Sequence, residues 1–246
     1  MASILYVCVR PEQGAADAEH RSFRRALGVP GLDRWDLLDR PLDESVTNRY
    51  DGVVIGGSPF NVVAEERDDL QRRVENNLEA LAQDAVDGRL SAMFTCYSIG
   101  VATRMLGGTV GTAVSESTRA TSIHITAAAA DDPVFGPSAP SMTVLTAHKE
   151  GSIEPPPGTV LLATNEDCPV QAYRAGAGLY ATQFHPEVTP QDFVDRMAYY
   201  RTTGYFDPHE YDLTAERVLA SAPTGTDLLR RFAETLTERA AARPAR

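Results

Sequence analysis

The stretch Leu90-Ser-Ala-Met-Phe-Thr-Cys96-Tyr-Ser-Ile-Gly-Val-Ala-Thr-Arg-Met-Leu106 organises the chain. Its apolar start, residues 90–94, predicts a short buried strand, and a cysteine follows at once. The residues after Cys96 predict a helix, because the apolar ones lie three or four apart: Ile99, Ala102, Met105 and Leu106. A thiol at a sharp strand-to-helix turn is the layout of a nucleophile elbow, and the helix N-terminus favours the thiolate. The alternative is a buried cysteine that serves as a small hydrophobic side chain.

A second stretch, Leu179-Tyr-Ala-Thr-Gln-Phe-His185-Pro-Glu187, favours the catalytic interpretation. Residues 179–184 predict a strand, and His185 and Glu187 leave its end. Pro186 fixes its own φ and keeps the preceding residue out of the helical region. The backbone that carries the imidazole of His185 is therefore conformationally restricted. A carboxylate two residues on can orient that imidazole and stabilise its charged form, as the acid of a catalytic triad does.

At these residues the sequence resembles the class I (triad) glutamine amidotransferases, nearest to the amidotransferase domain of GMP synthetase and its stand-alone relatives. The likeness covers roughly residues 50–190. Residues 183–187 match the His-Glu motif of the family without change. Residues 54–59, Val-Ile-Gly-Gly-Ser-Pro, resemble its Gly-Gly-Pro loop, and residues 147–150, Ala-His-Lys-Glu, resemble its Ser-His-Gly-Asp stretch.

The resemblance implies a role for each of these residues. Cys96 would be the nucleophile, His185 its base, and Glu187 the group that orients His185. The loop at Gly57 or Ser58 would supply one oxyanion-hole donor and the N–H of Tyr97 the other; the alternative for that loop is a plain β-to-α turn. His124 and His148 are histidines outside the triad, expected to be structural or to position substrate, with His148 the candidate substrate contact.

The elbow departs from the family pattern Gly-x-Cys-x-Gly-x-Gln. Phe94 and Ser98 replace the two glycines, and Gly100 replaces the glutamine that helps to hold the substrate in the family. We therefore count Ser98 and Gly100 among the substrate-binding candidates. The lost hydrogen-bonding side chain predicts weak glutaminase activity and better turnover of a larger amide that fills the space by Gly100.

Three functions remain open at this stage. The first is a cysteine amidase that works through a thioester and releases the amide nitrogen of glutamine or a related amide. Its ammonia would be released or pass to a separate synthetase. The second is acyl transfer from the same thioester to an amine acceptor. The third is a non-catalytic relative that binds a ligand or partner, which the altered elbow supports and the intact Cys-His-Glu set opposes.

Composition limits the class of protein. The 246 residues suit one α/β domain, and the net charge of 23 − 34 = −11 argues against nucleic acid as a partner. The odd number of cysteines, Cys8, Cys96 and Cys168, fits no zinc spacing. No signal peptide or transmembrane run is recognisable. We expect a protein of the reducing cytoplasm, with a small-molecule amide as substrate, no metal or cofactor and no membrane partner.

The remaining pattern alternates strands and helices. Strands are expected at 4–9, 35–38, 51–55, 142–146, 159–164, 170–174 and 179–183, and helices at 15–28, 64–86, 189–201 and 226–241. This predicts an open, mostly parallel, flavodoxin-like sheet with helices on both faces and the site at the carboxyl ends of the strands. We expect a single domain over 1–246, with an α/β core at 1–204 and a helical C-terminal extension at 205–246.

Overall fold

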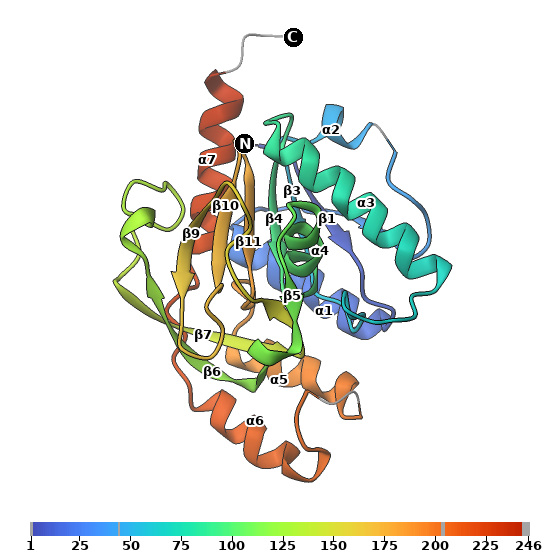
Figure 1. Ribbon diagram of the computed structural model, residues 1–246, viewed down its shortest axis with the longest axis vertical. Coiled ribbons are helices and arrows are strands. Elements are labelled where there is room, and N and C mark those ends of the chain that lie inside the picture. The colour runs from blue at the N-terminus through green and yellow to red at the C-terminus, as the bar shows by residue number, and fades with distance from the viewer. Residues whose placement is uncertain (1, 44, 203–204, 243–246) are drawn as a thin grey trace.

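The computed structural model describes residues 2–43, 45–202 and 205–242. Its main sheet has nine strands: β1 (Ile4–Cys8), β2 (Asp33–Asp36), β3 (Gly52–Ile55), β4 (Ser91–Thr95), β6 (Glu116–Ile125), β7 (Ser141–His148), β9 (Thr159–Thr164), β10 (Ala172–Ala175) and β11 (Leu179–Thr182). They lie side by side in the order β2-β1-β3-β4-β11-β10-β9-β6-β7 (Figure 1). A separate small sheet pairs β5 (Val110–Gly111) with β8 (Gly151–Ser152).

The strands that carry the two motifs are neighbours in the parallel half of the sheet. Strands β2, β1, β3, β4 and β11 run parallel, whereas β10, β9, β6 and β7 extend the sheet by antiparallel pairing. The predicted open, mostly parallel α/β sheet is thus confirmed. Because β4 and β11 pair in parallel, Cys96 and His185 leave the same edge of the sheet.

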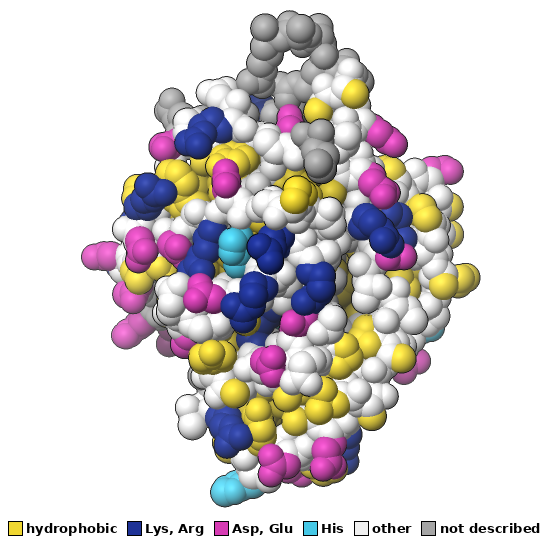
Figure 2. Space-filling model, turned by 180° about the vertical axis from the view of Figure 1, so that it is seen from behind, with side chains coloured by type: hydrophobic (Ala, Val, Ile, Leu, Met, Phe, Trp, Pro, Cys, Tyr) yellow, Lys and Arg dark blue, Asp and Glu magenta, His cyan; other side chains and the backbone are white. Residues whose placement is uncertain are grey.

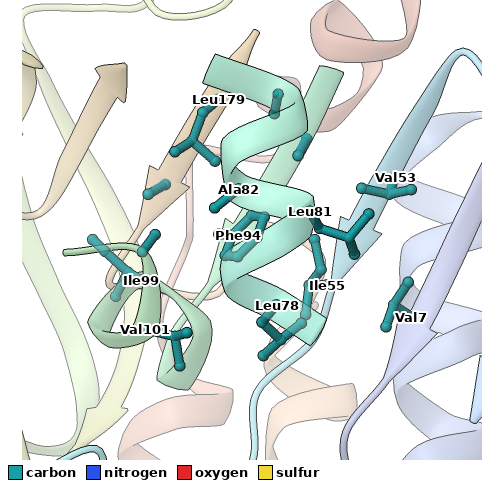
Figure 3. Packing of buried hydrophobic residues seen from close by; sticks show 14 of the residues in the cluster. Val7, Val53, Ile55, Leu78, Leu81, Ala82, Phe94, Ile99, Val101 and Leu179 are labelled. Carbon is teal, nitrogen blue, oxygen red and sulfur yellow. The ribbon is translucent and has the colours of Figure 1, made fainter. Parts of the chain in front are cut away.

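Helices cover both faces, as predicted (Figure 1). Helices α3 (Asp69–Val86) and α4 (Tyr97–Met105) lie on one face, and α1 (Gln13–Leu27) and α7 (Leu228–Ala242) on the other. The alternation along β1 shows why two layers form, since Leu5 and Val7 pack in one core and Tyr6 and Cys8 in the other. Figure 3 shows Leu78 and Leu81 of α3 packed towards the sheet beside Val53 and Ile55.

Local capping explains where two of the helices begin. Helix α3 starts five residues later than the predicted 64, because the carboxylate of Asp68 accepts the N–H of Gln71 at 2.7 Å and caps it. Helix α5 (Pro190–Met197) begins as predicted after Thr189, which forms a capping box with Asp192. Two shorter helices complete the chain, α2 (Val46–Arg49) and α6 (Tyr211–Leu219).

The surface mixes charges of both signs. Figure 2 shows basic side chains among the acidic ones on the face that α1 and α7 cover. Exposed hydrophobic side chains include Tyr199, Leu213 and Leu219. Among the described helices, none combines the length and the apolar character needed to cross a bilayer.

The C-terminal extension is packed into the core. Phe232 of α7 is fully buried and its ring meets that of Tyr180 of β11 edge-on, with 5.9 Å between centroids. Residues 203–204, where the predicted core and extension join, and residues 243–246 at the end lie outside the described residues. The packing of α7 supports the proposal that core and extension unfold as one domain.

We expect Phe232→Ala to destabilise the whole protein by about 3–5 kcal/mol, because it leaves a cavity in a core shared by α7 and the sheet. Chemical denaturation followed by circular dichroism should show one transition at lower denaturant concentration. Leu219→Ala, at a position 46% exposed, is the matched control and should move the midpoint little. A separate early transition for α7 alone would contradict the single-domain proposal.

Candidate active site

Cys96 sits in a strained backbone conformation between β4 and α4. Its φ of 56° and ψ of −111° make it the one non-glycine residue with positive φ in the described part of the chain. Such a conformation costs about 1–3 kcal/mol and is found where function requires it. The side chain is only 7% exposed, and its Sγ lies 3.7 Å from the carbonyl oxygen of Ala147. The structure therefore has the local geometry of a nucleophile elbow.

Ser98 is buried at this elbow and hydrogen-bonds to the backbone before the cysteine. Its Oγ accepts the N–H of Thr95 at 2.6 Å and donates to the carbonyl of Thr95 at 3.0 Å, and the residue is fully buried. The hydroxyl of Ser98 is thus committed to the backbone before the cysteine, and a contact of Ser98 with substrate stays a prediction.

His185 and Glu187 are paired and buried beside the thiol. Nδ1 of His185 donates to Oε1 of Glu187 at 2.8 Å, which leaves Nε2 for Cys96. Burial by itself lowers the pKa of His185, but the charges of Glu187 and Cys96 outweigh it and raise the pKa to about 9. Burial raises the pKa of Glu187, yet His185 and Arg196 hold it well below its usual range. The arrangement stabilises an imidazolium next to Cys96.

A buried ionic cluster continues from Glu187. Arg196 of α5 donates from Nη1 to Glu187 at 2.8 Å and to Glu19 of α1 at 3.1 Å. The carboxylate of Glu19 also pairs with Arg10 at 2.7 Å and accepts the hydroxyl of Tyr6 at 2.7 Å. Both carboxylates and both guanidinium groups are at most 7% exposed. Sequence patterns did not reveal this cluster, because its members are far apart along the chain.

The Gly56-Gly57 turn is shaped by the same cluster. A Cβ at Gly56 would lie 1.7 Å from Oε2 of Glu19, and one at Gly57 would lie 2.8 Å from Nη2 of Arg10. The N–H of Gly57 donates to Oε1 of Glu19 at 3.3 Å. The direction of this N–H favours Ser58 over Gly57 as the proposed oxyanion donor, with the N–H of Tyr97 at the start of α4 as its partner.

Two pockets meet at the thiol, since Cys96, Ser58 and Tyr205 line both. We name the first the Gly100 pocket; its other lining residues are Phe60, Asn61, Tyr97, Gly100, His148, Lys149, Glu150 and Gln183. We name the second the His185 pocket; its other lining residues are Arg10, Thr118, Ala147, His185, Phe193, Arg196, Met197, Tyr200 and Phe206. The unoccupied space in the His185 pocket is about 430 Å³, including solvent at its mouth.

The position of the missing glutamine is not left open. A Cβ on Gly100 would lie 3.1 Å from Cγ2 of Val62 and 3.7 Å from Cγ1 of Val110. Val62 therefore narrows the space along the Cβ direction of Gly100, while Gly100 still lines a pocket with about 300 Å³ of unoccupied space. That a larger amide fills this space stays a prediction.

His148 supports the wall of the Gly100 pocket. Its Nε2 lies 2.8 Å from Oε2 of Glu116 and its Nδ1 3.0 Å from the carbonyl oxygen of Glu150, and burial is nearly complete. Both neighbours are hydrogen-bond acceptors, so both ring nitrogens of His148 are engaged within the protein. The carboxylate of Glu150 in turn holds the N–H groups of Val62 and Val63. His148 thus lines the pocket with both nitrogens engaged, and His124 is exposed at the far end of β6.

Two clusters bring possible metal-binding atoms within 4.8 Å of one another. The first joins Glu19, His185 and Glu187, and the guanidinium groups of Arg10 and Arg196 already contact its carboxylates, which opposes another cation. The second consists of Glu116, His148 and Cys168. Glu116 there accepts hydrogen bonds from His148, Asn165 and Gln171, so its oxygens are already used.

The C-terminal extension contributes to the site. Tyr205 lines both pockets, and its carbonyl accepts the N–H of Thr118 at 3.1 Å, which anchors it to β6. Phe206 lines the His185 pocket. These residues follow the stretch that resembles known amidotransferases, so the sequence offered no signal for them.

Comparison with known proteins agrees with the resemblance in the sequence. The family profile "Glutamine amidotransferase class-I" matches residues 33–200. Gamma-glutamyl peptidase 3 of Arabidopsis thaliana is 26% identical over 189 residues, 71% of this chain and 72% of that protein. The glutamine-hydrolyzing GMP synthase of Streptococcus mutans serotype c is 28% identical over 147 residues, 58% of this chain but only 26% of that protein.

A solved structure shows the same fold. The crystal structure of a glutamine amidotransferase from Thermotoga maritima superposes with a TM-score of 0.74 at 18% identity, covering 97% of this chain and 99% of the other. At that identity the match establishes the fold.

Cys96 should react with iodoacetamide faster than Cys8 and Cys168 at neutral pH. The reason is that Cys96 lines both pockets beside an imidazolium, whereas burial raises the pKa of Cys8 to about 11 and of Cys168 to about 12. Peptide mapping of the folded protein after brief labelling measures the three rates. Equal labelling of all three cysteines would speak against an activated thiol.

Proposed function

Because the chain belongs to the class I glutamine amidotransferase family, we propose that it is a cysteine amidase that cleaves a glutamyl-type amide through a thioester. Cys96 is the nucleophile, His185 the general base and acid, and Glu187 the residue that orients His185. The observation that carries this proposal is the strained elbow of Cys96 beside a His185–Glu187 pair joined at 2.8 Å.

The chemistry follows from these positions. The thiolate of Cys96 adds to the amide carbon, and the carbonyl oxygen becomes an oxyanion that the N–H groups of Ser58 and Tyr97 stabilise. One such donor typically contributes about 3–4 kcal/mol to the transition state. The C–N bond then breaks while His185 gives its proton to the leaving nitrogen, and the thioester remains. Water, deprotonated by His185, hydrolyses the thioester and releases the acid.

The Gly100 pocket suits the acyl part of the substrate. Lys149 and Glu150 bring opposite charges to it, and Asn61 and Gln183 bring amide groups. An amino acid with its own ammonium and carboxylate matches such a lining. The names of the relatives point the same way, since one is a gamma-glutamyl peptidase and another a glutamine-hydrolyzing synthase. We therefore assign a γ-glutamyl amide as the substrate class.

The proposed partner of the enzyme depends on which nitrogen compound leaves the substrate and which acceptor takes the acyl group. With glutamine, the released ammonia would serve a synthetase, as the name of the glutamine-hydrolyzing GMP synthase relative suggests, and we propose that this synthetase is a separate partner. Acyl transfer to an amine acceptor is the second candidate function, favoured by the space of the His185 pocket next to the thiol. A free nucleophilic thiol suits a reducing compartment, and the cytoplasm is the location we propose.

The test is turnover of γ-glutamyl amides together with the mass of the intact protein. Cys96→Ala should abolish both hydrolysis and the covalent adduct, and His185→Ala should cost about as much, because members of a triad act as a unit. Glu187→Gln should cost less than either, though still orders of magnitude, since it removes the charge that supports the imidazolium.

Two variants serve as matched controls for these substitutions. Cys168→Ala removes a cysteine and His124→Ala removes a histidine, both outside the two pockets, and both should keep the activity. Wild-type turnover by Cys96→Ala would refute the proposed mechanism. Absence of any adduct with every amide tried would instead favour the non-catalytic, ligand-binding relative.

Gly100→Gln should lower kcat/KM for γ-glutamyl amides about tenfold, because its side chain meets Val62 at the pocket wall. Val62→Ala should make room, so the double variant should recover activity and improve the weak hydrolysis of glutamine that we predict for the native chain. A double-mutant cycle on kcat/KM measures this coupling. Additive effects, or efficient glutaminase activity of the native protein, would contradict it.

A further inference from the structure

We propose that the His185 pocket binds the amine part of the substrate, and that this part is an uncharged, apolar group carried on the amide nitrogen. The proposal rests on the proposed amidase function and specifies its substrate. The preferred substrate is then a γ-glutamyl amide of an apolar primary amine, and glutamine, which carries no such group, is a poor one.

The position of His185 decides which pocket receives the nitrogen. His185 must deliver its proton to the leaving nitrogen, so that nitrogen lies on the His185 side of the Cys96 sulfur. His185 lines the pocket named after it and does not line the Gly100 pocket. A substituent on the nitrogen therefore extends into the His185 pocket, while the acyl chain lies on the opposite side.

The walls of the two pockets differ in chemistry. Phe193 and Met197 of α5 face the His185 pocket together with Phe206 and the rings of Tyr200 and Tyr205. Its unoccupied space, about 430 Å³ including solvent at its mouth, is larger than that of the Gly100 pocket, about 300 Å³ on the same measure. Apolar and aromatic walls favour an apolar ligand, because burial removes its surface from water.

The charged residues of this pocket are already neutralised. Arg10 is paired with Glu19, and Arg196 with Glu19 and Glu187, at distances of 2.7 to 3.1 Å. Nε and Nη2 of Arg196 have no hydrogen-bond partner among the described residues, but both atoms are covered from solvent. The imidazolium of His185 is likewise paired with Glu187 and lies beside the thiolate of Cys96, so each cation of the pocket already has an anionic partner. An anionic amine would therefore lose hydration without gaining an unpaired counter-charge.

The opposite side has less room for the same bulk. Val62 narrows the space next to Gly100, and the Gly100 pocket is lined by charged and amide groups. The structure therefore places the departure from an ordinary glutaminase on the nitrogen side of the scissile bond.

The reaction balances with the groups present. The sulfur of Cys96 forms a bond to the γ-carbonyl carbon as the C–N bond breaks, and the imidazolium of His185 supplies the proton that converts the leaving nitrogen into a neutral primary amine. Water then cleaves the thioester to glutamate and restores the thiol. No oxidant, reductant or metal is consumed.

Three γ-glutamyl amides, assayed with the 246-residue chain, test the proposal. They are the methylamide, the n-pentylamide and the amide of ω-aminopentanoate. Methylamine and pentylamine are almost equally basic, so their leaving abilities match and the ratio of kcat/KM reports the pocket. We expect the pentylamide to exceed the methylamide about tenfold or more. The ω-carboxylate analogue, of nearly the same shape, should fall below the pentylamide.

Variants of the pocket wall make the assignment specific. Met197→Trp should fill the pocket and bring the pentylamide-to-methylamide ratio close to one, and Phe206→Ala should lower it several-fold by removing wall surface. The ratio cancels any general loss of activity. Leu213→Ala, at a position 43% exposed on α6 and outside both pockets, is the control and should keep the wild-type ratio.

The outcomes separate the two proposals. Equal kcat/KM for the methylamide and pentylamide, or a ratio that Met197→Trp leaves unchanged, would overturn the amine pocket while the amidase function stands. Preference for the ω-carboxylate analogue would overturn its apolar character. Failure of all three amides and of glutamine to acylate Cys96, followed by intact mass, would overturn the amidase function and the amine pocket together.

Discussion

The geometry of the site depends on one buried carboxylate, that of Glu19. It is fully buried and binds Arg10, Arg196 and the N–H of Gly57. A buried charge is tolerated only when it is paired, and removing one partner of such a pair is costly. Because these groups come from α1, the loop after β1, α5 and the turn after β3, their pairing fixes α5 against the parallel sheet. Through Arg196 the same pairing fixes Glu187, and through it His185.

Much of the fold and part of this site follow from local patterns. Apolar runs and capping residues predicted β4, β11 and the start of α5, and parallel pairing then brings Cys96 and His185 together. Glu19 could not be found in this way, because an acidic residue in an amphipathic helix is normally solvated. Its partner Arg196 lies 177 residues away. Long-range charge pairing leaves no periodic trace, so only the tertiary structure reveals it.

Substitutions at the elbow show which contacts depend on packing and cannot be predicted from spacing alone. Ser98 stands where the family has a glycine, and the sequence suggested a substrate contact. Its hydroxyl instead bonds both backbone groups of Thr95, which helps to hold Cys96 at positive φ. Gly100 likewise suggested free space, yet Val62, which follows a different strand, narrows it. In both cases the residue type showed that the elbow departs from the family pattern. The directions of the Ser98 and Val62 side chains depend instead on tertiary packing, which a local sequence pattern does not reveal.

The charges around Cys96 also explain how a buried site can run this chemistry. Arg10 and Arg196 offset Glu19 and Glu187, so the thiolate and imidazolium add no net charge to the cluster. Acylation consumes both charges at once, since sulfur becomes a thioester and His185 gives up its proton. The oxyanion forms while His185 is still charged, which keeps the buried region close to neutral at each step. In a low-dielectric environment a change of net charge would carry a large electrostatic cost. The buried arginine–glutamate pairs therefore orient the catalytic groups and hold the electrostatic balance in which the thiolate can form and react.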